Sequence, residues 1–206
     1  MDIRGLDAQQ LDAMREIANI GAGHAATALS QMTDRVIMIE VPEVRVLPLE
    51  DVDRVLGEPD DVMAAVMMRV LGDITGRTVQ VFPGPTAVRL TSLLVGGQDV
   101  DFPHEFPETH QSALKEAGNI IVGAYLNALS DFMGKLLIMS VPAFAIDMAG
   151  AIMTTTYLNF GEARDYVFCI NTRMLLGDER LSAHFLLIPD DTSLNVILRE
   201  MRLLAG

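Results

Sequence analysis

Apolar residues recur every three or four positions along residues 7–33, a spacing typical of an amphipathic helix. Asp7 and Gln10 have the spacing of a capping box at its start. The apolar stripe that we predict to be buried consists of Leu11, Met14, Ala18, Ala25, Leu29 and Met32. The opposite side of the same helix carries Asp12, Glu16, Asn19 and Gly23. The pattern therefore predicts a long helix with one buried face and one face open to solvent.

Shorter runs follow this helix. VIMIEV and EVRVLP are predicted to be two strands separated by Pro42, because a residue without an N–H suits a strand end. The runs that follow predict a short helix, a hairpin turning through residues 72–76, and a helix stopped by paired glycines; they are LEDVDRVLG, DVMAAVMMRVLG with TGRTVQVFPG, and PTAVRLTSLLVGG.

The same order of elements then returns. A second long helix is predicted over residues 108–133. Its predicted buried stripe is Leu114, Gly118, Tyr125, Leu129 and Phe132, and its opposite face carries Ser112, Glu116, Asn119 and Gly123. The later predicted elements are strands LLIMSV and AFAI around Pro142, helix DMAGAIMTTTYL, strands DYVFCINTRML and RLSAHFLLIP, and helix TSLNVILREMRLL.

The two long helices match in register, with far more identities than chance supplies. At an offset of 100 the identical pairs are Ala13/Ala113, Glu16/Glu116, Asn19/Asn119, Ile20/Ile120, Gly23/Gly123, Ala28/Ala128, Leu29/Leu129, Ser30/Ser130, Val41/Val141 and Pro42/Pro142. We interpret residues 1–99 and 100–206 as duplicated units with pseudo-twofold symmetry, each too small to bury its own core. The expected fold is α+β, a two-layer α/β arrangement in a single domain over residues 1–206. One shared, mostly antiparallel sheet would carry the two long helices.

Composition narrows the class of partner. The chain has 28 acidic and 15 basic residues and a net charge of -13, which argues against binding nucleic acid or anionic membranes. The single cysteine, Cys169, excludes an intramolecular disulfide, and we expect a cytoplasmic protein. The apolar run over 136–153 contains Pro142 and Asp147, so it predicts a strand, a turn and a helix rather than a membrane span.

The repeated polar residues lie on the predicted outer faces, where packing gives no reason to retain them. Glu16 and Asn19 are three residues apart, as are Glu116 and Asn119, so each pair projects from adjacent helical turns. A solvated surface with coincidental identities could explain one copy, but it explains two copies in register poorly. These four residues are therefore the candidate site.

The neighbouring glycines and isoleucines suggest a protein partner. A glycine inside a helix costs about 1 kcal/mol relative to alanine, so Gly23 and Gly123 are expected to leave room on the outer face for a partner. Exposed Ile20 and Ile120 beside the polar pair would suit a docking surface. The alternative is that both isoleucines lie under a loop.

Other chemistries fit less well. The run GAGHAATA has no lysine for a phosphate-binding loop, and Ala26 stands where a dinucleotide motif has its third glycine without a preceding strand. Ser30 and Ser130 have no evident His and Asp companions. No metal site is expected from the scattered histidines His24, His104, His110 and His184.

A longer pattern contains both polar pairs: Asp or Ser, three residues, Glu, two residues, Asn, 22 residues, Pro. Its members are Asp12, Glu16, Asn19 and Pro42, and then Ser112, Glu116, Asn119 and Pro142. This pattern resembles the signature of the CheC/CheX/FliY family of chemotaxis phosphatases. The length and the two intact motifs resemble CheC most, because CheX has one working motif per chain and FliY has an additional flagellar-switch domain.

The resemblance implies hydrolysis of the aspartyl phosphate on the response regulator CheY. Asn19 and Asn119 would then position the attacking water, and Glu16 and Glu116 would dock and orient the regulator. Asp12 and Ser112 would lie at the edge of the contact, and Pro42 and Pro142 would be structural. The chain would need no cofactor of its own, because the regulator's site would supply Mg²⁺.

The resemblance also implies a second partner, the receptor deamidase CheD. The segment from Asp147 to Thr154 would carry that contact by its position after the second motif. The alternative function is a non-catalytic adaptor that binds CheD or the flagellar switch. We expect a monomer, because internal pseudosymmetry already supplies what a single-motif relative gains by dimerisation.

Overall fold

The computed structural model describes residues 8–97, 100–158 and 166–204. The elements are α1 (Ala8–Thr33), β1 (Met38–Pro48), η1 (Leu49–Asp51), α2 (Asp53–Leu56), β2 (Val62–Gly72), β3 (Gly76–Pro83), α3 (Gly84–Val95), α4 (Glu108–Met133), β4 (Leu137–Met139), β5 (Ala143–Met148), α5 (Ala149–Leu158), β6 (Tyr166–Leu176), β7 (Glu179–Pro189) and α6 (Asp191–Leu204). The predicted α+β class is confirmed, and every strand pairing among the described residues is antiparallel.

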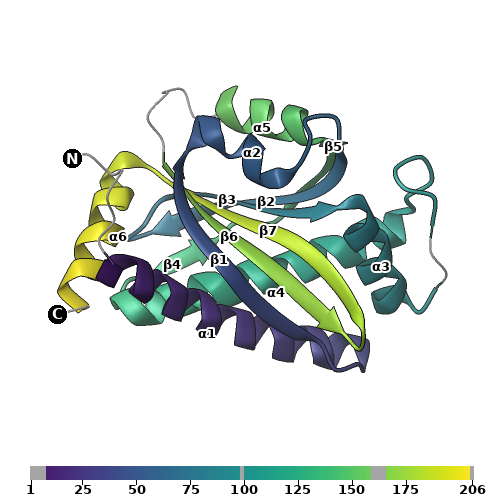
Figure 1. Cartoon of the computed structure of the whole chain (residues 1–206), viewed down its shortest axis with the longest axis horizontal. Helices are drawn as coiled ribbons and strands as arrows, with labels where there is room; N and C mark the ends of the chain where they lie inside the picture. The colour runs from purple at the N-terminus through teal and green to yellow at the C-terminus, as the bar shows by residue number, and fades with distance from the viewer. Residues whose placement is uncertain (1–7, 98–99, 159–165, 205–206) are drawn as a thin grey trace.

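The sheet interlocks the two halves of the chain. Its order is β1-β6-β7-β3-β2-β4, with β5 also pairing with β2 (Figure 1). The hairpin of each half, β2–β3 or β6–β7, is therefore extended by the first strands of the other half. Strands β3 and β7 meet at the centre, where Val79 pairs with Leu186 and Gln80 with Phe185. This symmetric order supports the predicted duplication.

The outer strands differ from the prediction and from each other. The expected pair of strands around Pro42 is one strand, β1, with a shift of register between Glu40 and Glu43. The side chain of Pro42 lies outside what the structure describes. In the second half the strand is broken between β4 and β5, where the half-buried Pro142 lies and Ser140 N–H donates to the Arg69 carbonyl at 2.9 Å. The continuous edge strand β1 of the first half thus corresponds to two short strands, β4 and β5, in the second half.

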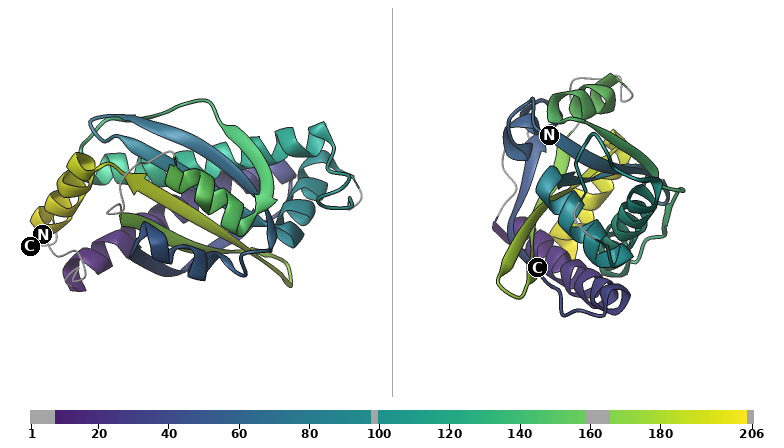
Figure 2. Two further views of the ribbon diagram at one scale, coloured as in Figure 1. Left: turned by 90° about the horizontal axis from the view of Figure 1, so that it is seen from above. Right: turned by 90° about the vertical axis from the view of Figure 1, so that its right-hand side faces the viewer.

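Helices cover both faces of the sheet. In Figure 1 the long helices α1 and α4 run along the lower side of the sheet, and α2 and α5 lie above it. Figure 2 gives the same layers from the end of the molecule, with α5 on one side and α1 on the other. A large core packs under α1, α3, α4 and α6, and a smaller one under α2 and α5. Strands β2 and β6 share one burial pattern over their first nine positions, which explains their nearly continuous apolar sequences.

The two long helices approach each other closely at Gly21. A Cβ on Gly21 would lie 2.6 Å from Cδ1 and 2.9 Å from Cα of Tyr125 in α4. Only a residue without a side chain fits there, because real Cβ atoms do not come so near. This contact fixes how α1 lies against α4, and therefore how the candidate sites are carried.

The two long helices also end in the same way. Asp34 ends α1 with φ 51° and Gly134 ends α4 with φ 61°, both in the left-handed conformation. Asp7 lies outside the described residues, so the predicted capping box is not described; Gln10 is buried and donates to the Leu198 carbonyl at 3.1 Å. Met32 was predicted to be buried and is 41% exposed, because the helix ends there beyond the edge of the core.

Candidate active site

The outer face of α1 is as the helical pattern predicts. Asp12, Glu16, Asn19 and Gly23 are all exposed. Met14, Ala18, Ala25 and Leu29 of the opposite stripe are buried in the large core. A Cβ placed on Gly23 would meet nothing within 4 Å. The first candidate pair therefore stands on an open surface.

The outer face of α4 is only partly open. Ser112 and Glu116 are exposed, but Asn119 is half-buried. The expectation that Gly123 leaves a gap for a partner is wrong: Gly123 is buried, and a Cβ there would lie 3.2 Å from Cε of Met139 in β4. Strand β4 covers this position. The helical pattern alone could not indicate that, because it contains no information about neighbouring strands.

The isoleucines follow the same division. Ile20 is 41% exposed, whereas Ile120 is half-buried. The predicted apolar contact surface thus exists beside Asn19 and is reduced beside Asn119.

The candidate side chains have no polar partner in the part of the chain that the structure describes. Among the described residues, the side chains of Glu16, Asn19, Glu116 and Asn119 make no hydrogen bond or ion pair. Asp12 is held by Arg15, with Nη1 3.1 Å from Oδ1. Carboxylate acceptors and amide groups that can both donate and accept are consequently free to meet another molecule.

Ser30 and Ser130 have a structural position. The Ser30 hydroxyl accepts from Ile37 N–H at 2.9 Å and donates to the Ala26 carbonyl at 2.7 Å. The Ser130 hydroxyl donates to the Lys135 carbonyl. Each serine ties the end of a long helix to the segment leading into the next strand, and that role explains why both copies carry one.

Asp147 lies apart from both pairs. It is exposed at the end of β5, and its Oδ1 accepts from Met148 N–H at 2.8 Å, directly before α5. Met148 is 45% exposed, and Thr154 is exposed on α5. The segment is accessible on the side of the sheet opposite α1 and α4.

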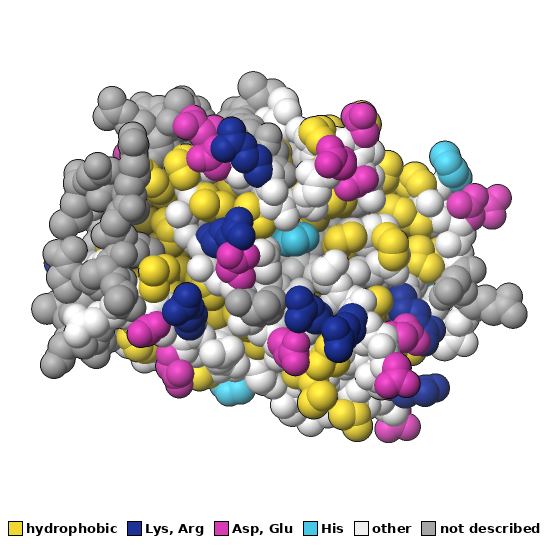
Figure 3. Space-filling model, viewed as in Figure 1, with side chains coloured by type: hydrophobic (Ala, Val, Ile, Leu, Met, Phe, Trp, Pro, Cys, Tyr) yellow, Lys and Arg dark blue, Asp and Glu magenta, His cyan; other side chains and the backbone are white. Residues whose placement is uncertain are grey.

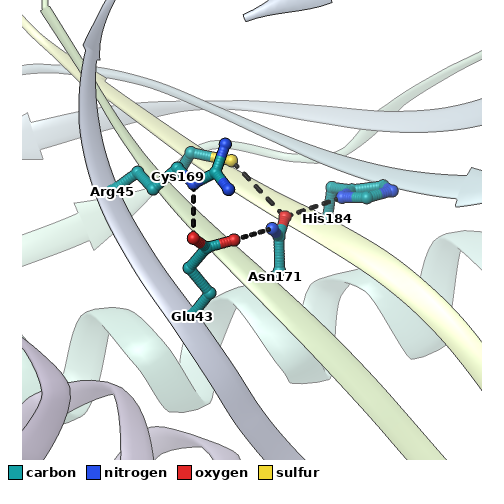
Figure 4. Close-up of polar contacts among 5 residues, drawn as sticks. All are labelled: Glu43, Arg45, Cys169, Asn171 and His184. Carbon is teal, nitrogen blue, oxygen red and sulfur yellow. Dashed lines mark hydrogen bonds and ion pairs between the residues drawn. The ribbon is translucent and has the colours of Figure 1, made fainter. Parts of the chain in front are cut away.

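Sequence reasoning missed a row of polar side chains across β1, β6 and β7 (Figure 4). Asn171 Nδ2 donates to Glu43 Oε2 at 3.1 Å, and Glu43 Oε1 lies 2.6 Å from Arg45 Nε. Asn171 Oδ1 lies 2.9 Å from Nδ1 of His184 and 3.7 Å from Sγ of Cys169. An asparagine inside an apolar strand was the available signal, but its partners depend on strand register.

This row is unsuited to nucleophilic catalysis. Burial raises the pKa of the Cys169 thiol to about 12, so it stays protonated near neutrality. Burial also lowers the pKa of His184 and favours the neutral ring. A neutral imidazole hydrogen-bonded to an amide and a protonated thiol form a satisfied network within the sheet.

The surface carries charges of both signs. Acidic and basic side chains are intermixed over the face drawn in Figure 3, with hydrophobic side chains between them. The searched part of the chain has no helix that is both long and apolar enough to cross a bilayer. In that same part, no three His, Cys, Asp or Glu side chains group as metal ligands.

The sequence was compared with models of known protein families and with known proteins, and a family model matches most of both long helices. The model of the CheC-like family matches residues 10–46 and 110–146, two segments 100 residues apart that contain both candidate pairs. The chain is 33% identical over 190 residues to the CheY-P phosphatase CheC of Bacillus subtilis, covering 90% of each chain.

The chain is also similar to two FliY proteins. The flagellar motor switch phosphatase FliY of Bacillus subtilis is 28% identical over 141 residues, which span 68% of this chain and 36% of that one. The crystal structure of Thermotoga maritima FliY has the same fold, with a TM-score of 0.78 at 24% identity and 97% coverage of both chains.

Proposed function

Because the chain belongs to the CheC-like family, we propose that it is a phosphatase acting on the aspartyl phosphate of a phosphorylated CheY-like response regulator. The observation that carries this proposal is the Glu and Asn pair on each long helix, unengaged among the described residues and most open at Glu16 and Asn19. The CheY-P phosphatase activity named for the relative supports it.

The proposed chemistry needs little from the phosphatase. The oxygen of a water molecule forms a bond to phosphorus, and the bond from phosphorus to the aspartyl oxygen breaks. The carboxylate stays on the regulator, and the protons of the water leave with inorganic phosphate. Such transfers gain chiefly from positioning and charge stabilisation. Asn19 and Asn119 would orient the water, since an amide oxygen accepts one of its hydrogen bonds without any change of protonation.

The glutamates would hold the regulator in place. Glu16 precedes Asn19 by three residues, so both side chains project from one side of α1 on adjacent turns. A carboxylate there can pair with a lysine beside the phosphorylated aspartate. Mg²⁺ would be supplied by the regulator, and its positive charge would stabilise the phosphoryl group.

The test measures how long the regulator stays phosphorylated. The chain is added to phosphorylated cognate regulator with Mg²⁺, and inorganic phosphate release is followed. We expect strong acceleration by the wild type and almost none by Asn19→Ala/Asn119→Ala, since the loss of a water-positioning group slows its own site by roughly 10²-fold or more. Asn195→Ala, which removes an exposed amide from α6, is the matched control and should keep wild-type activity.

Two outcomes would reject the proposal. Wild-type rates in the double variant would mean that the water is held by other residues. No acceleration by the wild type would favour the adaptor function, in which the chain binds CheD or the flagellar switch without catalysis.

A contact with a CheD-type receptor deamidase forms a separate part of the proposal. The exposed Asp147, Met148 and Thr154 at α5 offer a surface away from the helix sites. Asp147→Lys should weaken binding of the deamidase and leave phosphatase activity unchanged. Asp178→Lys, an equal charge reversal in the β6–β7 hairpin, is the control. Equal binding by both variants would reject this contact.

A further inference from the structure

The two candidate sites differ in what lies beside the glycine one turn after the asparagine. Gly23 is exposed, with open space where a Cβ would stand. Gly123 is buried beneath Met139, whose Cε would be 3.2 Å from such a Cβ. The motif residues are alike, so the difference comes from the strand beside each helix.

An open groove of about 730 Å³ runs beside the first site. Along α1 its wall includes Gly23 and Thr27, which continue the line of Asn19 at steps of four residues. Its other side is formed by the segment leading into β1, where Val36 is 79% and Met38 57% exposed. Exposed apolar side chains along an open groove are typical of a surface that binds protein.

We infer that the first site is the main docking site, and that the phosphorylated regulator extends from Asn19 into the groove that begins at Gly23, while Met139 covers the equivalent glycine at the second site. The inference rests on the proposed function, because the occupant is the same regulator. Asn19 and Thr27 are eight residues apart, about 12 Å along the helix. A folded domain seated on Asn19 covers about 800 Å² in a standard interface, so it extends over this groove.

The lining supports a protein occupant over a small charged ligand. Asp34 and Arg35 contribute one charge of each sign, and most of the remaining lining is apolar or uncharged, including Ala26 and Ile39. No single sign of charge dominates, so shape and apolar contact would determine binding.

The first experiment separates the sites by inactivating one at a time. Asn119→Ala, which keeps the first site, should retain kcat/KM within about twofold of wild type. Asn19→Ala, which keeps only the covered site, should lose about tenfold or more, equivalent to roughly 1.4 kcal/mol of transition-state stabilisation.

The second experiment removes the covering side chain from the second site and places one at the first. In the Asn19→Ala background, Met139→Ala should lower KM at the second site by several-fold. In the Asn119→Ala background, Gly23→Leu should raise KM by about tenfold. His24→Leu adds the same side chain to the neighbouring exposed position on α1, off the line of Asn19, and should leave KM unchanged. Circular dichroism checks that each variant is folded, and the Gly23 variants remain informative if Met139→Ala unfolds.

The outcomes distinguish this inference from the proposed function. Equal activity of the two single-asparagine variants, or no effect of Gly23→Leu beyond that of His24→Leu, would overturn the inference alone. An inactive wild type would reject catalysis. Binding of regulator carrying the phosphoryl mimic beryllofluoride would then still test the groove, since Gly23→Leu should weaken that binding and His24→Leu should not.

Discussion

The two halves of this protein carry the same four-residue signature in different surroundings. On α1 the polar face is bare, and on α4 it is partly covered by the short strand β4. Duplication therefore preserved the residues of the site more faithfully than the access to them. What decides access is the edge strand next to each helix.

The contrast between Ile39 and Met139 locates the cause. These residues occupy equivalent positions in β1 and β4, and both are half-buried. Yet Ile39 leaves the space at Gly23 empty, whereas Met139 fills the space at Gly123. The side chain of Met139 is longer than that of Ile39, and it is the terminal Cε that reaches Gly123.

The largest effect is expected at Gly21, where the halves meet. Gly21→Ala would bring a Cβ within 2.9 Å of the Tyr125 backbone, so we expect about 1–3 kcal/mol of destabilisation despite alanine's better helix propensity. Urea denaturation measures it. The counterpart in α4 is the buried Ile121, where Ile121→Val should cost about 0.5–1.5 kcal/mol. A Gly21→Ala protein as stable as wild type would contradict the close helix contact.

Only the second half has a tyrosine at position 125, since the counterpart in α1 is Ala25. This tyrosine should make the stability of the protein depend on pH. Burial raises the pKa of Tyr125 above its ordinary value near 10, because the anion is disfavoured inside the protein. Above pH 10 the unfolded chain loses this proton while the folded protein keeps it, so stability should fall by about 1.4 kcal/mol per pH unit. Denaturant midpoints between pH 9 and 11 measure the slope. In Tyr125→Phe the dependence of stability on pH in this range should be weaker, because the phenol is gone. An unchanged slope would show that other groups cause it.

Ser30 and Ser130 should differ by a smaller amount. Ser30→Ala removes an acceptor from the Ile37 N–H as well as a donor, so it should cost about 1–2 kcal/mol. Ser130→Ala removes a donor to the Lys135 carbonyl and should cost about 0.5–1 kcal/mol. Thermal unfolding compares them, with Ser30→Thr as a control that keeps the hydroxyl. A larger loss at Ser130 would reverse the predicted order.

The smallest effect is expected at the paired glycines. Gly23→Ala adds a methyl group in open space and should stabilise the protein by up to about 1 kcal/mol. Gly123→Ala requires the end of Met139 to shift, so its gain should be smaller. Equal gains at both positions would show that Met139 yields without cost.

Much of this structure follows from local pattern. The spacing of apolar residues predicted both long helices and their polar faces, and the short strand connections predicted an antiparallel sheet. The in-register repeat of Glu16 and Asn19 at Glu116 and Asn119 predicted the duplication. Local pattern failed where distant segments meet. The burial of Gly123 depends on the pairing of β4 with β2, and helical periodicity contains no information about that pairing.

The polar row in the sheet was hidden for a related reason. Glu43, Asn171 and His184 become neighbours only once β1 pairs with β6 and β6 with β7. A shift of one residue in either register would turn these side chains to opposite faces. Strand order between the halves, rather than the content of either half, determines which side chains meet.

The exchange of strands between halves also governs how the chain can be made. Glu43 bonds to Asn171, 128 residues further along, and β1 pairs with a strand that emerges late in synthesis. Contacts of such long range slow folding and leave apolar strand edges exposed in the meantime. A ribosome that has released only the first hundred residues would therefore present an incomplete sheet, and the nascent chain would depend on protection from aggregation until β6 arrives.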